Sequence, residues 1–443
     1  MFARNAERTT SPAIRRGLWP LSLAVVTFVM ALATLAVSPA AVAKDGHEND
    51  RDQHWVGTWA AAPQPVDAAP PFNQKNVVFT NQTIREIVHT NVAGHLLRVR
   101  LSNAFGAYGS APLIIGDAHV AVRQQNSTIV SATDHQLTFG GATSTLIPAG
   151  AFVISDPVDL SLPPFSDLAI SIYLPGPTGQ VTYHGTASQT NYIVSGNMTS
   201  AASLPGAQTK NSWYFLSGVE VSNRDDDARA VVTLGASITD GTASTLNANH
   251  RWPDLLAQRL IARYGPEEVA VLNEGIAGNR SIFDAIGQNG PARFDRDVMG
   301  QAGVKYVVVA DLPINDVGFP FLVGPTQAVT ADQIIGGLKQ LIRRAHEKGL
   351  KIIAGTLTPY KGAFYWTATG EAIREQVNDF IRSGAFDGVV DFAGATADRN
   401  NPLVYAAQFD SGDHLHPNDA GYQAMANAFD LSLFRRDQDE KDH

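Results

Sequence analysis

The 443-residue sequence contains no cysteine and only five methionines, and charged residues make up 17% of it. Without cysteine, disulfides, thiolate catalysis and cysteine-ligated metal sites are excluded. Beyond residue 37, no apolar run approaches the length that a membrane-spanning helix needs. Stability must therefore come from a large apolar core, and the chain is long enough to form two domains.

Basic residues are outnumbered by acidic ones, and the formal net charge is −9. Residues 1–43 contain four Arg and one Glu, so the rest of the chain carries a net charge of about −12. An acidic chain is a poor candidate for binding nucleic acid or anionic membrane surfaces. We therefore expect neither as a partner, and the sequence does not indicate an oligomeric state.

The N-terminal segment resembles a secretory signal peptide. Its arginines precede an apolar stretch at residues 18–37, and Ala41-Val42-Ala43 offers small residues for cleavage. We predict cleavage after Ala43 and export of a protein that is not held in the membrane. An uncleaved membrane anchor is the alternative. The pair Arg15-Arg16 suggests twin-arginine export, but the flanking residues fit that signal poorly.

Patterning divides the chain into six segments. We predict a signal peptide at 1–43, a disordered segment at 44–53, a β-rich accessory domain at 54–222, a linker at 223–229, a catalytic domain at 230–435 and a charged tail at 436–443. In the second half, apolar strands are expected at 230–235, 268–273, 304–310, 351–357 and 388–392, and a helix at 331–348. Alternation of strands and helices predicts an α/β fold with a parallel sheet covered on both faces.

The β-rich segment shows short apolar or alternating runs, such as 97–101 and 168–174, broken by Gly, Pro, Asn and Ser. This pattern predicts a β-sandwich that is jelly-roll-like. Exposed rings could bind polysaccharide there, or they could be core residues; the candidates are Trp55, Trp59, Tyr108 and Trp213. The acidic run at 225–227 could hold calcium, but its spacing favours a solvated connector.

Three residues have the chemistry of a nucleophilic hydrolase. Ser237 follows an apolar strand, and Asp413 and His416 lie near the C-terminus. A serine hydroxyl is a weak nucleophile until an imidazole takes its proton, and that imidazole needs a carboxylate to fix its tautomer. The simpler alternatives are a turn serine and an Asp/His pair that caps a helix. His414 is the rival base, one residue after the aspartate.

Donors for a tetrahedral oxyanion can also be found. Gly278 has no Cβ to block the approach to its N–H, Asn315 has a side-chain amide, and Ser237 has its own backbone N–H. An ordinary glycine turn and a loop-capping Asn are the alternatives. Each of the three residues follows a predicted strand, and ligands bind at the carboxyl ends of parallel strands. We therefore expect the three to converge at one edge of the sheet.

The order of these blocks resembles the SGNH, or GDSL-type, serine hydrolase family, and the blocks match Ser237, Gly278, Asn315 and Asp413/His416. The finer pattern is similar to the secreted bacterial branch of xylan-associated, XynE-like acyl esterases. It includes the segments 251–255, 293–297 and 410–422 and, in the β-rich region, 55–59 and 101–106. The resemblance implies a three-layer α/β/α, flavodoxin-like catalytic domain, with His416 as the base and no metal or cofactor.

The resemblance also implies a carboxylic-ester hydrolase that acts through an acyl-enzyme on short acyl esters, such as those of polysaccharides. A lipase or arylesterase is one alternative, and a carbohydrate-binding protein with a degenerate hydrolase domain is another. The family has Asp where this chain has Ala236, and Gly where it has Pro313. Arg251 and Trp252 are expected near the nucleophile and are candidates for substrate binding.

Overall fold

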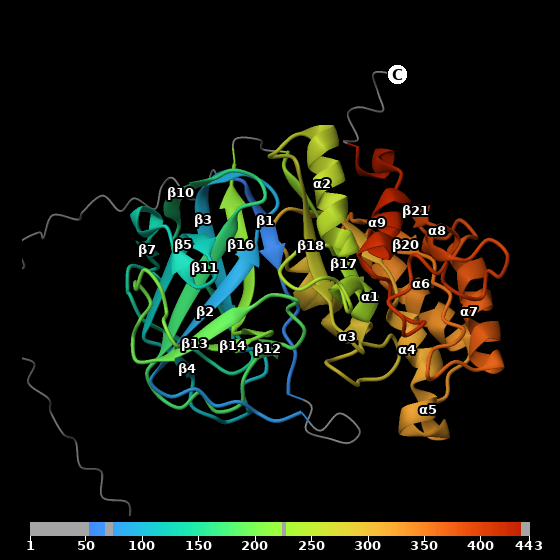
Figure 1. Ribbon diagram of the computed structural model, residues 1–443, viewed down its shortest axis with the longest axis horizontal. Helices are drawn as coiled ribbons and strands as arrows, with labels where there is room; N and C mark the ends of the chain where they lie inside the picture. Colours follow the sequence, from blue (N-terminus) through green and yellow to red (C-terminus); the bar gives the residue numbers. More distant parts are fainter. Residues whose placement is uncertain (1–52, 67–73, 224–226, 436–443) are drawn as a thin grey trace, which may run out of the picture. The chain divides into compact units, whose positions relative to one another are not determined.

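The computed structural model describes residues 53–66, 74–223 and 227–435, which belong to one compact unit (Figure 1). The predicted signal peptide, the tail at 436–443 and nearly all of the 44–53 segment lie outside the described residues, as do 224–226 of the predicted linker. Within the described ranges, no helix is both long and apolar enough to cross a membrane.

The described residues up to 222 form antiparallel sheets, which confirms the predicted β-rich region. One sheet has the order β1-β16-β3-β10, with β9 also paired to β3, and another has the order β14-β13-β2-β11-β5-β6, with β7 paired to β5. Two short pairs are β12–β15 and β4–β8. The bounds are β1 Trp55–Ala60, β2 Gln82–His89, β3 Gly94–Ser102, β4 Leu113–Ile115, β5 Asp117–Gln125, β6 Thr128–Ile129, β7 His135–Gln136, β8 Thr145–Ile147, β9 Phe152–Ile154, β10 Val158–Leu162, β11 Asp167–Leu174, β12 Tyr183–His184, β13 Asn191–Ser195, β14 Gln208–Lys210, β15 Trp213–Tyr214 and β16 Leu216–Ser222.

The second half confirms the predicted α/β fold with a parallel sheet, whose order is β18-β17-β19-β20-β21. The strands are β17 Arg229–Gly235, β18 Val269–Gly275, β19 Val304–Val309, β20 Lys351–Gly355 and β21 Gly388–Val390. The helices are α1 Ser237–Asp240, α2 Trp252–Tyr264, α3 Gly290–Phe294, α4 Leu312–Gly318, α5 Pro320–Val323, α6 Ala331–Glu347, α7 Ala368–Ile381, α8 Phe392–Thr396 and α9 Asp419–Asn427, and a π-helical turn, η3, spans Asp295–Met299. Strand bounds agree with the sequence predictions to within two residues, and α6 agrees to within one.

Strand β17 is buried along its whole length, as expected for a central parallel strand. Its successive side chains point to opposite faces. Val231 packs in an apolar cluster with residues of α2 and α9. Its neighbour Val232 belongs to a second cluster that includes residues of α6 and α7. Alternation along one strand therefore distributes the helices between two apolar clusters.

The antiparallel strands pack directly against the parallel sheet. The N–H of Gly57 in β1 donates to the carbonyl of Ala302 over 3.1 Å, and the Asn91 side chain donates to the carbonyl of Val271 over 2.6 Å. A Cβ on Gly57 would lie 2.6 Å from a methyl carbon of Leu272, so glycine permits this close approach. Hydrogen bonds and apolar side chains thus cross the predicted boundary between 54–222 and 230–435, and the boundary itself stays a prediction.

Candidate active site

Ser237 is the first residue of α1, directly after the carboxyl end of β17. The turn between them is tight at Gly235, where a Cβ would lie 2.0 Å from Oγ1 of Thr239. Any other side chain would collide with the first turn of α1. Glycine therefore allows the strand to pass straight into the helix and presents Ser237 at this edge of the sheet.

The structure brings Ser237, His416 and Asp413 together in one hydrogen-bonded chain. Nε2 of His416 lies 2.8 Å from Oγ of Ser237, and Nδ1 of His416 lies 2.6 Å from Oδ2 of Asp413. With Nδ1–H donated to the carboxylate, Nε2 is left as the acceptor for the serine hydroxyl. The arrangement has the connectivity of a nucleophile, its base and the group that orients the base.

Asp413 is held in its charged form. Its Oδ1 accepts from the backbone N–H groups of Leu415 and His416 over 2.9 and 2.8 Å. Partial burial favours the neutral acid, but the bonds from the His416 ring and backbone outweigh it and lower the pKa of Asp413 well below its usual range. A carboxylate that stays ionised keeps the imidazole in one tautomer.

His414, the rival base, points elsewhere. Its backbone is left-handed, with φ +62°, and its Nδ1 lies 2.6 Å from Oδ2 of Asp410. Its side chain is about half exposed, whereas only 12% of the His416 side chain is accessible. The geometry therefore pairs His416, and not His414, with Ser237.

The three proposed oxyanion donors lie in the segments that follow β17, β18 and β19: Ser237 begins α1, Gly278 lies in a loop and Asn315 lies in α4. Within the described residues, no acceptor takes the backbone N–H of Ser237 or of Gly278. Gly278 has φ +81°, and a Cβ there would lie 2.6 Å from Cδ1 of Ile286, so the loop requires glycine. Asn315 is buried and uses one N–H of Nδ2 on the carbonyl of Asn279, over 2.9 Å. Its second N–H has no acceptor among the described residues.

Pro313 fits the start of α4. It lies in the first turn of α4, where a helix leaves backbone N–H groups without partners in any case. Asn315 is therefore presented from a regular helix in spite of the missing glycine.

Residues 233–424 match the model of the GDSL-like Lipase/Acylhydrolase family. We call this part of the chain the GDSL-type domain, and the match supports an ester-hydrolysing serine hydrolase. The matched range contains Ser237, Gly278, Asn315, Asp413 and His416. Membership of the secreted, XynE-like branch stays a prediction.

Solved structures similar to the GDSL-type domain include two enzymes. LAE5, an alpha/beta hydrolase enzyme from the metagenome of Lake Arreo in Spain, is 27% identical; the match covers 46% of this chain and 95% of LAE5, with a TM-score of 0.37. Axe2, an acetylxylan esterase from Geobacillus stearothermophilus, is 21% identical; the match covers 47% of this chain and 95% of Axe2, with a TM-score of 0.36. No curated protein sequence matches the chain.

Two buried residues hold the loop that contains Gly278, and neither was among the site residues predicted from the sequence. The Arg293 guanidinium donates to Oδ1 of Asn279 and to the carbonyl of Gly235, each over 3.0 Å. Asp316 accepts from both the N–H and the hydroxyl of Ser281 over 2.5 Å. Arg293 lies in a segment that resembles the family branch, which was its only signal in the sequence.

A third buried residue, His184, reaches the nucleophile helix from β12. Its Nε2 lies 3.0 Å from Oδ1 of Asp240, the last residue of α1, and its Nδ1 lies 3.0 Å from the carbonyl of Ala62. Oδ2 of Asp240 accepts from the N–H of Ala277 over 2.8 Å. The β-rich region therefore contacts α1 directly, and Asp240 links this contact to the loop that carries Gly278.

The two predicted substrate-binding residues lie in the interior. Trp252 is fully buried, with its ring stacked on Phe429 at a centroid distance of 5.5 Å. Arg251 is 5% exposed and pairs with Asp254 over 2.7 Å. Both side chains thus pack beneath the nucleophile segment, and the structure gives no support to a substrate contact by either.

The aromatic rings proposed for polysaccharide binding divide into two groups. Trp59 and Trp213 are buried and in edge-to-face contact at 4.9 Å, and Trp55 is also buried. Tyr108 is fully exposed. The core interpretation therefore holds for the three tryptophans.

Proposed function

We propose that the chain is a secreted carboxylic-ester hydrolase that works through an acyl-enzyme. The observation that carries this proposal is the hydrogen-bonded chain from Ser237 through His416 to Asp413, with contacts of 2.8 and 2.6 Å. It lies at the carboxyl edge of a parallel sheet, and the backbone N–H groups of Ser237 and Gly278 have no acceptor among the described residues. Export is inferred from residues 1–43 alone.

In the proposed mechanism, His416 takes the proton of Ser237 as the hydroxyl attacks the acyl carbonyl. Asp413 stabilises the imidazolium that forms. The N–H groups of Ser237 and Gly278 and the free N–H of Asn315 bind the oxyanion. His416 then protonates the departing alcohol, and a water molecule hydrolyses the acyl-enzyme by the same steps.

Short acyl esters, such as those of polysaccharides, are the proposed substrates, because the sequence resembles xylan-associated acyl esterases.

Lipid or aryl esters are the alternative, and exposed apolar side chains favour them. The Tyr365 hydroxyl donates to Oδ1 of Asn315 over 3.3 Å. The ring centroid of Tyr365 lies 4.6 Å from that of Phe364, which in turn lies 6.4 Å from that of Phe321 in α5. Phe364 and Phe321 are more than 60% exposed, so a row of aromatic rings leads from Asn315 to the surface.

Hydrolysis of p-nitrophenyl esters from acetyl to long acyl chains tests the mechanism and the substrate together. The chain from residue 44 onward, which contains the compact unit, is compared with Ser237→Ala and His416→Ala. We expect either change to remove nearly all turnover. Turnover by Ser237→Ala at the wild-type rate would exclude the mechanism. A maximum at acetyl supports short acyl esters, and a maximum at long chains supports the lipid alternative.

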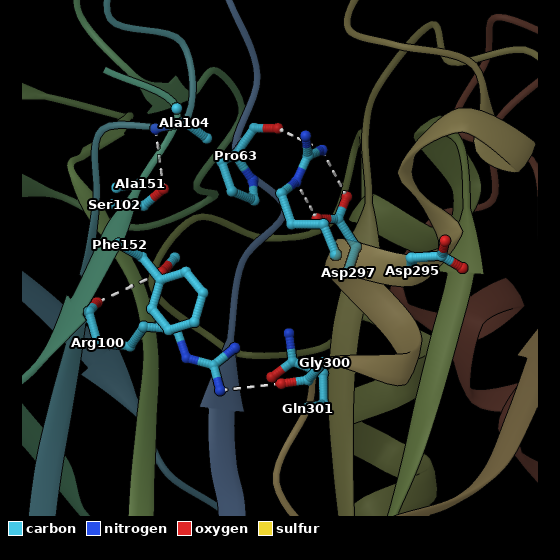
Figure 2. Close-up of a pocket in the computed structure, with 13 residues that line it drawn as sticks. Pro63, Arg100, Ser102, Ala104, Ala151, Phe152, Asp295, Asp297, Gly300 and Gln301 are labelled. Carbon is cyan, nitrogen blue, oxygen red and sulfur yellow. Dashed lines mark hydrogen bonds and ion pairs between the residues drawn. The ribbon is translucent and has the colours of Figure 1, made fainter. Parts of the chain in front are cut away.

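A second function, saccharide binding, is favoured by a cavity of about 410 Å³ between β3 and β9 on one side and η3 on the other (Figure 2). Its charges are already paired, Arg100 with Glu220 over 2.7 Å and Arg296 with Asp297 over 2.6 Å. Nε of Arg100 is buried and has no hydrogen-bond partner in the described part of the chain, and Phe152 is about half exposed. A neutral ring with hydroxyl acceptors and an apolar face fits these walls.

Calorimetric titration with neutral xylo-oligosaccharides tests this second function. Phe152→Ala should abolish binding, and Tyr108→Ala, which removes an exposed ring outside the cavity, should leave it intact. Absence of binding at millimolar saccharide, or loss of binding in Tyr108→Ala alone, would contradict it.

For the architecture, we propose the three-layer, flavodoxin-like arrangement for the GDSL-type domain and a jelly-roll-like sandwich for the β-rich region. The strand order β18-β17-β19-β20-β21 supports the former, since numbered along the chain it is 2-1-3-4-5. Residues of both large antiparallel sheets share one apolar cluster, for example Ile84 with Val99, which supports the latter.

A further inference from the structure

The first turn of α1 lacks the usual cap. A helix leaves its first N–H groups without intrahelical partners, and the side chain of the N-cap residue normally accepts from the second or third of them. Ala236 is the N-cap residue of α1, and its methyl group accepts nothing. The second and third N–H groups of α1 belong to Ile238 and Thr239, and both need another acceptor.

Asp311 is the acceptor for both. Its Oδ2 lies 2.8 Å from the N–H nitrogen of Ile238 and 3.4 Å from that of Thr239. Its Oδ1 accepts from the Thr239 hydroxyl over 2.5 Å. Asp311 follows β19, 73 residues beyond Ile238, and is only 5% exposed. The cap on the nucleophile helix therefore comes from a neighbouring strand and not from its own N-cap residue.

An aspartate at position 236 would serve the same two N–H groups, since an N-cap carboxylate accepts from the second and third residues of its helix. The GDSL-type motif carries an aspartate at that position. We propose that Asp311 is a positioning residue that replaces the missing Asp of the nucleophile turn and holds the Ser237 hydroxyl toward His416. The catalytic part of this proposal rests on the proposed function, whereas its structural part rests on the contacts of α1.

The site has room for one such carboxylate. A Cβ on Gly235 would lie 2.5 Å from Oδ1 of Asp311, so Asp311 packs against the backbone of the turn. A second carboxylate at position 236 would compete for the same donors, and two like charges at this distance repel each other in a buried site. Ala236 and Asp311 therefore form an exchangeable pair, in which one position or the other carries the acid.

The test is a swap of the acid between the two positions. Ala236→Asp, Asp311→Ala and the double variant are compared with wild type for kcat and KM on p-nitrophenyl acetate. We expect each single change to lower kcat by about tenfold or more, with little change in KM, because one cap is worth roughly a factor of ten. The double variant should recover most of that loss. Asp311→Asn, which keeps one acceptor oxygen, should lose less than Asp311→Ala.

Asp391 provides the matched control, since it is the N-cap residue of α8 and also follows a strand of the parallel sheet. Asp391→Ala should leave kcat unchanged. Added to Ala236→Asp, it should not restore the kcat that Ala236→Asp lowers. A double variant, Ala236→Asp with Asp311→Ala, no more active than Asp311→Ala alone would overturn the proposal, as would an Asp311→Ala variant with wild-type kcat.

Thermal unfolding of the same variants separates this proposal from the proposed function. The swap should restore the melting temperature that each single change lowers, whether or not the protein hydrolyses the ester. If Ser237→Ala keeps wild-type turnover, the proposed mechanism is wrong. The melting temperatures of the swap variants then still show whether Asp311 caps α1. If the mechanism holds and the melting temperatures of the swap show no recovery, the cap proposal fails alone.

Discussion

Asn315 owes its orientation to a phenol outside the sequence motifs. The Tyr365 hydroxyl donates to Oδ1 of Asn315, so Nδ2 is directed to the carbonyl of Asn279 and toward the proposed oxyanion position. Burial raises the pKa of Tyr365 well above its ordinary value, so the phenol stays protonated and remains a donor. The amide is thereby prevented from rotating and presenting its oxygen to a developing negative charge.

Asn315→Ala should therefore lower kcat by about 10²–10³ with little change in KM, because the lost donor acts on the transition state. Tyr365→Phe removes only the orienting hydroxyl and should cost about tenfold. Steady-state kinetics on p-nitrophenyl acetate measures both. An Asn315→Ala variant within twofold of wild type would exclude this side chain from the oxyanion site.

Helix α6 shows how local signals set the bounds of an element. Oγ1 of Thr330 accepts from the N–H of Gln333 over 3.3 Å, and the Gln333 side chain accepts from the N–H of Thr330 over 2.9 Å. This reciprocal capping box begins the helix, and its apolar residues recur at helical spacing. The same local logic explains why strands β17 to β21 were predicted to within two residues.

Thr330→Ala should lower the free energy of unfolding by about 1 kcal/mol through loss of the cap. Thr330→Ser keeps an acceptor oxygen and should lose less than half of that. Urea denaturation measures both, and kcat is expected to stay unchanged because the Thr330 side chain bonds only within its own helix among the described residues. Equal losses in the two variants would show that packing of the methyl group, and not capping, is responsible.

The β-rich region and the GDSL-type domain are joined through a buried ion pair. His184 contacts Asp240 of the nucleophile helix, and both side chains are almost fully buried. Burial alone would lower the pKa of His184, and Arg251 also lowers it, but Asp240 and the Ala62 carbonyl outweigh them and raise the pKa above its ordinary value of 6.5. The imidazole therefore holds its proton more tightly in the folded protein than in the unfolded chain.

This pKa shift predicts a pH-dependent stability. Because the folded pKa of His184 is raised, its contribution is complete below pH 6.5 and is lost as the pH rises through the folded value. His184→Gln keeps a hydrogen-bonding side chain but does not titrate. The difference in free energy of unfolding between wild type and His184→Gln should therefore shrink as the pH rises from 5.5 to about 9. A difference that is constant or grows with pH would contradict the shift.

The residues that carry the proposed chemistry could be found in the sequence because each lies beside a strong local signal. Ser237 and Asn315 follow apolar strands, and Gly278 lies in a glycine turn after a third. Asp413 and His416 are three residues apart, so their contact is almost a local property of the chain. Strand ends and short spacings are set by nearest neighbours, and periodicity reveals them.

Only the tertiary structure decided which distant groups support these residues. Asp311, Tyr365 and His184 reach their partners across 72, 50 and 56 residues. The same is true of Trp252, whose place in the core depends on α9 and α8 folding over it. Sequence patterns report burial and local geometry, whereas a hydrogen bond between remote side chains depends on how strands and loops pack. The proposed nucleophile could therefore be selected from the sequence, but the carboxylate that caps its helix could be seen only in the folded chain.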